Sequence, residues 1–140
     1  MLIVSGLGVS KTKIATHALV DSFGVKDDDI FLNVGICGAS REYKIGELIE
    51  ISKIKYKEQV YLLNEHSQKT ITCLDEEAKD DKHQIVDMES YGFYEAVKGM
   101  KNACIFKVVS DHFEPHLVTK EKTKMLIFNV IEEIIKKVHN

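Results

Sequence analysis

Several residue types and patterns on which common functions depend are scarce in this sequence. Arg41 is the only arginine among 19 basic residues, which excludes a site built from several bidentate arginine–phosphate pairs within one chain. The 19 basic residues face 22 acidic ones, and the net charge of −3 gives no general attraction to nucleic acid. No apolar run approaches the roughly 20 residues of a membrane helix. The opening run Leu2–Val4 is too short for a signal peptide and lacks its basic flank. We therefore expect neither a nucleic-acid nor a membrane partner.

Cysteine and proline are also scarce. Cys37, Cys73 and Cys104 are odd in number and lie in apolar stretches, which favours reduced, buried thiols in a cytoplasmic protein over a disulfide framework. The 140 residues, 44% hydrophobic with 8 Gly and 1 Pro, predict one ordinary globular domain spanning residues 1–140. A chain of this length buries on the order of 70% of its unfolded surface. Such a core needs no disulfide or metal, and we expect no cofactor.

The first third of the chain predicts a strand, a helix and a second strand. An apolar strand is expected over residues 2–5, and a helix over residues 10–23 with Ser10 as its N-cap. Residues 30–34 predict a strand that runs into a glycine-rich loop, Gly35–Ser40. A strand that ends in such a loop is a natural place for a ligand.

The middle third of the chain predicts mainly strands, and helices follow only after it. Further strands are expected over residues 46–57, 60–63, 70–74, 84–87 and 103–109. A helix is expected over residues 89–100, and a closing helix after Pro115 carries apolar residues from Met125 to Ile135 that are spaced to form one face. The order of elements predicts an α/β protein with buried strands and helices packed on the faces of the sheet.

Polar side chains follow three of these strands. They are Asn33 before the glycine-rich loop, Asp87 with Glu89, and Ser110 with Asp111. In open α/β sheets ligands bind beyond the carboxyl ends of the strands, so the three ends can meet over one pocket. Structural alternatives remain open for these residues alone: Asp87 can cap the following helix, Glu89 can favour its positive end, and Asp111 can form a turn.

Two other patterns do not complete a ligand site. Gly6 and Gly8 resemble the start of a dinucleotide fingerprint, but no third glycine follows at the required spacing. Metal-binding residue types cluster at Asp111, His112, Glu114 and His116. Pro115 interrupts any regular helical face there, and no third His or Cys stands close by. We therefore expect no metal site.

Four segments match the pattern of one known family, in the same order along the chain. Asn33–Ala39 has the form of a glycine-rich strand end, and Tyr43–Leu48 follows it. Val86–Gly92 contains a Met-Glu pair, and Val108–His112 contains a Ser-Asp pair. Together they resemble the superfamily of nucleoside phosphorylases and nucleosidases, which includes purine nucleoside phosphorylase and methylthioadenosine/S-adenosylhomocysteine nucleosidase. The resemblance implies a compact version of the three-layer αβα fold of the phosphorylase/hydrolase type, with a mixed central sheet.

The activity implied by this resemblance is cleavage of the N-glycosidic bond of a purine nucleoside. Asp111 would be the general acid that protonates N7 of the leaving base. Glu89 would accept hydrogen bonds from the ribose hydroxyls, and Met88 would pack against the sugar. The other expected substrate-binding residues are Asp87, Ser110, Gly35, Ile36, Cys37 and Gly38. The implied partners are a small-molecule nucleoside and further copies of this chain, in a dimer or a larger homo-oligomer.

The sequence departs from the family pattern in three ways. Family members are longer, and the chain is expected to lack their N-terminal segment, which carries a phosphate-binding glycine loop in phosphorylases and a water-activating Glu in nucleosidases. Asn33 and Ile36 stand where purine phosphorylases place an Arg and a Ser to hold phosphate. Asp75–Glu77 stands where an aromatic residue often stacks on the base. We therefore expect hydrolysis rather than phosphorolysis, with a non-catalytic nucleoside-binding or vestigial protein as the alternative.

Overall fold

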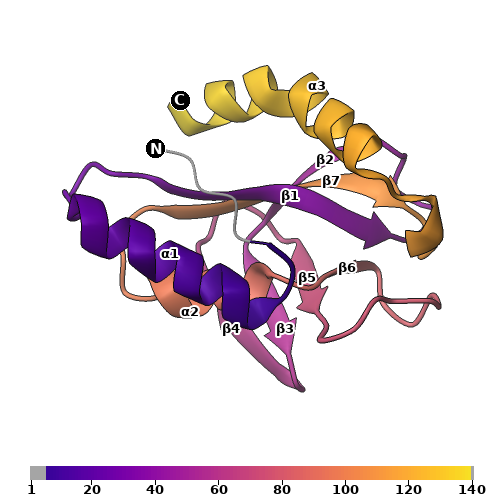
Figure 1. Cartoon of the computed structure of the whole chain (residues 1–140), viewed down its shortest axis with the longest axis horizontal. Coiled ribbons are helices and arrows are strands. Elements are labelled where there is room, and N and C mark those ends of the chain that lie inside the picture. Colours follow the sequence, from indigo (N-terminus) through magenta and orange to yellow (C-terminus); the bar gives the residue numbers. More distant parts are fainter. Residues whose placement is uncertain (1–5, 140) are drawn as a thin grey trace.

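The computed structural model describes residues 6–139, in which six consecutive strands separate the first two helices and one further strand precedes the last helix (Figure 1). The helices are α1 (Val9–Phe23), α2 (Ser90–Val97) and α3 (Lys120–His139), with a 3-10 turn at Pro115–Leu117. The strands are β1 (Phe31–Ala39), β2 (Leu48–Ile51), β3 (Lys53–Tyr56), β4 (Gln59–Leu62), β5 (Thr70–Cys73), β6 (Ile85–Asp87) and β7 (Ala103–Asp111). The strand expected over residues 2–5 lies outside the described residues.

The strands form one mixed, seven-stranded sheet in the order β2-β7-β1-β6-β5-β3-β4. β1 runs parallel to β7, and β5 runs parallel to both β3 and β6. The pairs β1/β6, β2/β7 and β3/β4 are antiparallel. The mixed central sheet expected from the sequence is therefore confirmed.

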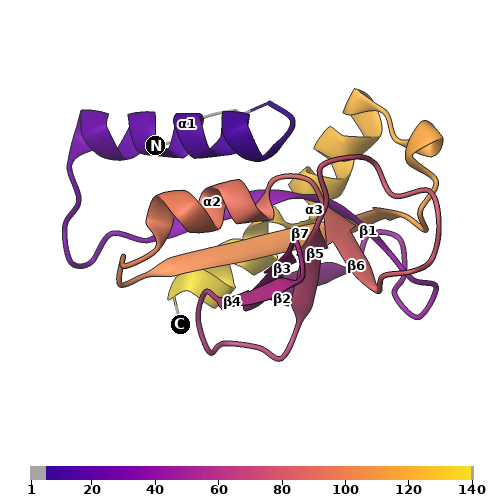
Figure 2. The same cartoon turned by 90° about the horizontal axis from the view of Figure 1, so that it is seen from below.

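Helices cover both faces of this sheet, which confirms the layered α/β architecture. α3 lies over β1 and β7 on one face, and α2 lies on the other (Figure 1). α1 runs beside α2 and lies farther from the strands, as Figure 2 shows from below. No helix among the described residues has the length and apolar character needed to cross a bilayer.

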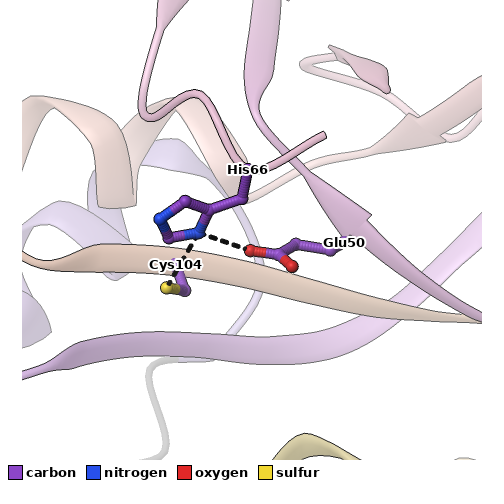
Figure 3. Close-up of side chains that lie close together, drawn as sticks. All are labelled: Glu50, His66 and Cys104. Atoms are coloured by element: carbon purple, nitrogen blue, oxygen red, sulfur yellow. Dashed lines mark hydrogen bonds and ion pairs between the residues drawn. The ribbon is translucent and has the colours of Figure 1, made fainter. Parts of the chain in front are cut away.

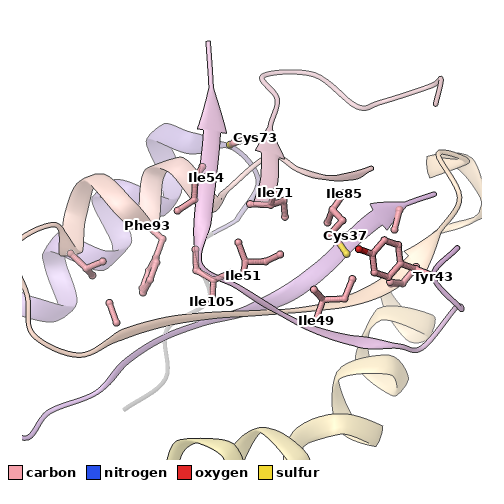
Figure 4. Close-up of a cluster of buried hydrophobic side chains, with 14 residues drawn as sticks. Cys37, Tyr43, Ile49, Ile51, Ile54, Ile71, Cys73, Ile85, Phe93 and Ile105 are labelled. Atoms are coloured by element: carbon pink, nitrogen blue, oxygen red, sulfur yellow. The ribbon is translucent and has the colours of Figure 1, made fainter. Parts of the chain in front are cut away.

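The larger hydrophobic core lies between the sheet and α2 (Figure 4). Four isoleucines from different strands, Ile51, Ile54, Ile71 and Ile105, are completely buried in it. Burial of each such side chain stabilises the fold by about 1.5–3 kcal/mol relative to exposure. On the opposite face, alternate residues of β7 pack against α3 and form a smaller core: Cys104, Phe106, Val108, Val130 and Ile134.

Two strand predictions need correction. Residues 35–39 are not a loop but the second half of β1. β7 pairs with β1 as far as Gly38, and β6 pairs with Gly38 and Ala39, so neighbouring strands hold the glycines extended despite their poor strand propensity. The single strand expected over 46–57 is divided at Ser52, whose N–H donates to Lys69 O at 3.0 Å.

The helix predictions also need correction in detail. Gly8, not Ser10, is the N-cap of α1, and no side chain caps this end. α1 buries Thr12 and Thr16, while Ile14 is 68% exposed. In α3 the residues that face the sheet follow a four-residue spacing: Leu126, Val130, Ile134 and Val138. The remaining apolar residues of the expected single face are exposed: Met125, Phe128, Ile131 and Ile135.

Candidate active site

The candidate site is organised around Gly38, where three strands lie side by side. Gly38 is opposite Val86 of β6 on one side and opposite Asp111 of β7 on the other, after a shift of register at Cys37. A Cβ atom on Gly38 would lie 3.2 Å from Val86 Cγ2 and 3.5 Å from Asp111 Oδ2. Because adjacent strands are about 4.8 Å apart, the backbones of Val86 and Asp111 are separated by about 10 Å.

The strand directions correct one part of the sequence argument. The carboxyl ends of β1, β6 and β7 were expected to meet at one edge, but β6 is antiparallel to β1. Its last residue, Asp87, therefore lies beside Cys37 of β1, one residue before Gly38, and not at the end of the strand. Asp111 is the last residue of β7, Asp87 lies beside the body of β1, and Glu89 is at the start of α2.

Both oxygens of the Asp111 carboxyl group accept hydrogen bonds, and the residue is only 8% exposed. Ser110 Oγ lies 2.6 Å from Asp111 Oδ1 and 3.1 Å from Cys37 O. The backbone N–H of Glu114 donates to Asp111 Oδ2 at 2.9 Å, which is the turn-forming role left open by the sequence. These contacts fix the direction of the carboxyl group at the end of β7.

A buried ion pair lies behind this edge. Lys107 Nζ is 3.0 Å from Asp87 Oδ2, and the two side chains are 2% and 1% exposed. Asp87 also accepts hydrogen bonds from the N–H and Oγ of Ser90 at 2.9 and 2.6 Å, so it holds the start of α2. Burial alone would lower the pKa of Lys107, but the charges of Asp87 and Glu89 outweigh this effect, and its pKa is raised.

Glu89 connects this pair to the start of α1. One carboxylate oxygen lies 3.5 Å from the N–H of Gly8, and the other accepts a hydrogen bond from Met88 N–H at 3.2 Å. Burial raises the pKa of Glu89, and the positive charge of Lys107 opposes this shift only in part. A partly buried carboxyl group with a raised pKa beside other ionisable groups is a feature of functional sites.

The remaining predicted residues are divided between the two faces of β1. Strand alternation places Gly35 and Cys37 on the face that carries Lys107, with Lys107 Nζ 3.1 Å from a Cβ built on Gly35. The same alternation turns Ile36 toward the α3 face, with Val34. Burial raises the pKa of the Cys37 thiol to about 12, so this thiol is neutral and acts as a small apolar filler.

A hollow of about 250 Å³ lies beyond the carboxyl ends of β1 and β7. Its lining residues are Ser40, Arg41, Asp81, His112 and Phe113. The side chain of Arg41 is 80% exposed and lies 3.8 Å from Glu114, while His112 Nδ1 donates to Ala39 O at 3.0 Å. The hollow is therefore next to the end of β7, but Asp111 itself is not among its lining residues.

Lys107 is the residue of this site that the sequence analysis missed. The one available signal was its position, because it is the only charged residue in the otherwise apolar run 103–109. Its partner could not be read from the sequence, since Asp87 lies 20 residues earlier in the chain, on a strand that is not adjacent to β7.

Comparison with known proteins identifies the fold. No family model matches the chain, and no curated protein matches its sequence. A methylthioadenosine/S-adenosylhomocysteine nucleosidase of Chlamydia trachomatis is similar with a TM-score of 0.76 and 18% identity, over 99% of this chain and 76% of its own. The corresponding nucleosidase of Colwellia psychrerythraea 34H, solved with adenine, gives 0.67 and 17% over 91% and 75%.

A third similar structure is that of an enzyme with a different name. Futalosine hydrolase of Helicobacter pylori gives a TM-score of 0.62 and 14% identity, over 92% of this chain and 71% of its own. The chain thus has the fold of these nucleosidases, which is the fold that the resemblance of its four motifs implied.

Proposed function

We propose that this protein hydrolyses the N-glycosidic bond of a purine nucleoside. The observation that carries the proposal is the arrangement around Gly38, which places the fixed carboxyl group of Asp111 two strands from β6, the strand that leads into Met88 and Glu89. The nucleosidases of similar fold support the same type of reaction.

In this proposal Asp111 delivers a proton to N7 of the departing purine. A purine anion is a poor leaving group, so protonation as the C–N bond breaks lowers the barrier. The hydrogen bonds from Ser110 and from the N–H of Glu114 aim the carboxyl group. A positioned general acid of this kind contributes roughly 10²–10⁴-fold to the rate.

The proposed role of Glu89 is to bind the ribose hydroxyls and to favour the positive charge that develops on the sugar. Its raised pKa means that the charged form is disfavoured by its surroundings and weakens the fold at neutral pH. Retention of such a group is expected where function requires it. Met88 is partly buried beside it and is proposed to pack against the sugar.

Hydrolysis is preferred over phosphorolysis because the cations near the site are already engaged. Lys107 is buried in its pair with Asp87, and Arg41 is an exposed residue beside Glu114. Asn33 and Ile36 provide neither of the phosphate ligands that purine phosphorylases use.

Replacement of Asp111 by Asn tests this assignment. Asp111→Asn keeps the shape of the side chain but cannot donate a carboxylic proton, so base release should fall by about 100-fold or more. Asp28→Asn, at an exposed carboxylate in the turn between α1 and β1, is the matched control and should keep the parent rate. A rate in Asp111→Asn equal to that of the parent would refute the role of Asp111.

The alternative is a protein that binds nucleosides without cleaving them. One observation favours it. Hydrolysis needs a group that activates water, and the carboxylate next to Glu89, Asp87, is already bound to Lys107 and Ser90. Saturable binding of an adenine nucleoside in calorimetry, with no base released, would select this alternative.

We also propose that the protein self-associates in the cytoplasm. Phe128 on α3 is 77% exposed and Met125 is 64% exposed, and apolar side chains so exposed are typical of contact surfaces. The three cysteines are free thiols, as expected in a reducing compartment. Light scattering should give a dimer or larger species for the parent chain and a smaller one for Phe128→Glu, with the exposed Lys124→Glu as control; a monomeric parent would refute self-association.

A further inference from the structure

Three side chains with metal-binding atoms converge at a place far from the candidate active site (Figure 3). Glu50 comes from β2, Cys104 from the start of β7, and His66 from the segment between β4 and β5. His66 Nδ1 lies 2.8 Å from Glu50 Oε2 and 3.8 Å from Cys104 Sγ. One ligand atom from each residue lies within 4.8 Å of the other two. In residues 6–139 this is the only group of three such residues that meets this condition.

The strand register explains why Glu50 and Cys104 are neighbours. Glu50 is opposite Phe106 in the antiparallel pair of β2 and β7. Cys104 is two residues from Phe106 and therefore lies on the same face of the sheet. His66 then closes the group from outside the sheet, as Figure 3 shows.

The segment that carries His66 is held on both sides of the cluster. Asn64 Nδ2 donates to Ala103 O at 2.9 Å, beside Cys104, and Asn64 Oδ1 accepts from the N–H of His66 at 3.0 Å. Ser67 Oγ donates to the backbone oxygen of Glu50 at 2.8 Å. The residues flanking His66 are thus tied to the two strands that carry the other ligand atoms, and the cluster does not depend on the ion pair alone.

We propose that Glu50, His66 and Cys104 form a binding site for a divalent zinc-class cation, with water as the fourth ligand. A tetrahedral zinc site has Zn–N distances of about 2.0–2.1 Å and a Zn–S distance of about 2.3 Å, which place nitrogen and sulfur about 3.6 Å apart and nitrogen and oxygen about 3.4 Å apart. To reach this geometry, the 3.8 Å separation must shorten by about 0.2 Å and the 2.8 Å separation must lengthen by about 0.6 Å. Sulfur and oxygen, which lie within 4.8 Å of each other, must be about 3.6 Å apart. Thiolate, imidazole and carboxylate are all established zinc ligands.

The geometry argues against a nucleophilic thiol–imidazole–carboxylate triad made of the same residue types. A triad uses the two ring nitrogens separately, one for the nucleophile and one for the carboxylate. Here both partners face the same atom, His66 Nδ1. Convergence of three donor atoms on one point is the arrangement that a cation requires.

The charge and exposure of the cluster also suit a cation. On binding, the Cys104 thiol releases its proton to solvent, and one thiolate and one carboxylate then balance the two charges of the ion. The side chain of His66 is 54% exposed and that of Glu50 is 18% exposed, so an ion can enter from the His66 side. Cys104 is only 8% exposed and forms the inner wall.

This site is separate from the candidate active site and does not depend on the proposed function. Cys104 and Asp111 are seven residues apart on β7, about 23 Å along the strand, and lie near its opposite ends. The cation would join β2, β7 and the β4–β5 segment, and therefore has a structural role in this proposal.

Titration of the full chain with Zn²⁺ and Co²⁺ tests the proposal. After treatment with a chelator, the protein should bind one equivalent of Zn²⁺ in competition with a chromophoric chelator. Co²⁺ should give a thiolate charge-transfer band and the visible bands of a tetrahedral site. Cys104→Ser and His66→Gln should each weaken Zn²⁺ binding by more than about tenfold, because even loss of an outer-shell partner costs about 10–100-fold.

Two control variants remove the same residue types elsewhere. Cys73→Ser and His83→Gln should bind both ions as the parent does. Circular dichroism checks folding, and if Cys104→Ser does not fold, the exposed His66→Gln decides the matter. The proposal is overturned if the parent binds no Zn²⁺ in the micromolar range, if Co²⁺ gives no thiolate band, or if the two ligand variants bind as tightly as the controls.

Discussion

The buried pair of Lys107 and Asp87 allows a quantitative prediction. The Nζ to Oδ2 distance is 3.0 Å and both side chains are almost completely buried. At an effective dielectric constant of about 20, two unit charges at this distance attract each other by about 5 kcal/mol. Lys107→Met keeps most of the stem of the side chain but leaves the Asp87 charge without its partner, so the free energy of unfolding should fall by about 3–5 kcal/mol.

The double variant separates the charge from the packing. Lys107→Met combined with Asp87→Asn contains no buried charge at this pair, and Asn can still accept the hydrogen bond from the N–H of Ser90. Most of the loss should therefore be recovered, with a coupling energy of about 3 kcal/mol between the two positions.

Urea denaturation of the parent, the two single variants and the double variant measures these quantities. The reasoning fails if Lys107→Met costs less than about 1 kcal/mol, within the range of an exposed pair. It also fails if the double variant is as unstable as the sum of the two single variants, because the pair would then have no coupling energy.

Three further predictions concern the surroundings of the site. Gly92→Ala should destabilise the fold by about 1–3 kcal/mol, because the new Cβ would lie 2.2 Å from the backbone oxygen of Val9 and must push α2 away from α1. Thermal unfolding measures this loss. The control Ser10→Ala, at an exposed position with no capping bond, should be nearly neutral. Glu89→Gln should gain stability relative to the parent as the pH rises above about 4.5, because the raised pKa of Glu89 means that the folded state binds this proton more tightly; an unfolding series that shows a constant difference from pH 4 to about pH 7 would contradict this. Cys37, whose pKa is about 12, should resist iodoacetamide at about pH 8 until the protein is unfolded, as mass spectrometry can show.

Much of the fold follows from local patterns in the sequence. The apolar run 103–109 became β7, which lies between β1 and β2 in the sheet, and the glycine at position 24 ends α1 by donating its N–H to Val20 O at 3.0 Å. This strand and this helix end both depend on residues that are adjacent in the sequence, and could therefore be predicted. The antiparallel direction of β6 could not, because a strand of three residues pairs with whichever neighbour the tertiary structure provides.

The same distinction applies to the candidate site. The Met-Glu and Ser-Asp motifs indicated Glu89 and Asp111, because each motif is contained in a few consecutive residues. Lys107 acquires its role only through Asp87, which lies on a different strand. The cluster of Glu50, His66 and Cys104 joins residues 16 and 38 positions apart, so no local spacing could indicate it.

Exposure of the helices was also beyond prediction from periodicity. The threonines at 12 and 16 of α1 are buried against neighbouring backbone, and Thr16 Oγ1 donates to Thr12 O at 2.8 Å. Ile14 is on the other side and is exposed. A pattern of hydrophobicity identifies an apolar face of a helix, but it does not show whether other residues of the fold pack against that face.

The most direct test of the proposed function is release of base from a panel of adenosine, inosine, methylthioadenosine and S-adenosylhomocysteine, each with and without phosphate. We predict release of the free base from at least one of them at a rate that does not change when phosphate is added. Release only with phosphate would contradict the assignment of Asn33 and Ile36 as residues that hold no phosphate. No release from any of the four, with saturable binding, would contradict catalysis and leave nucleoside binding as the function.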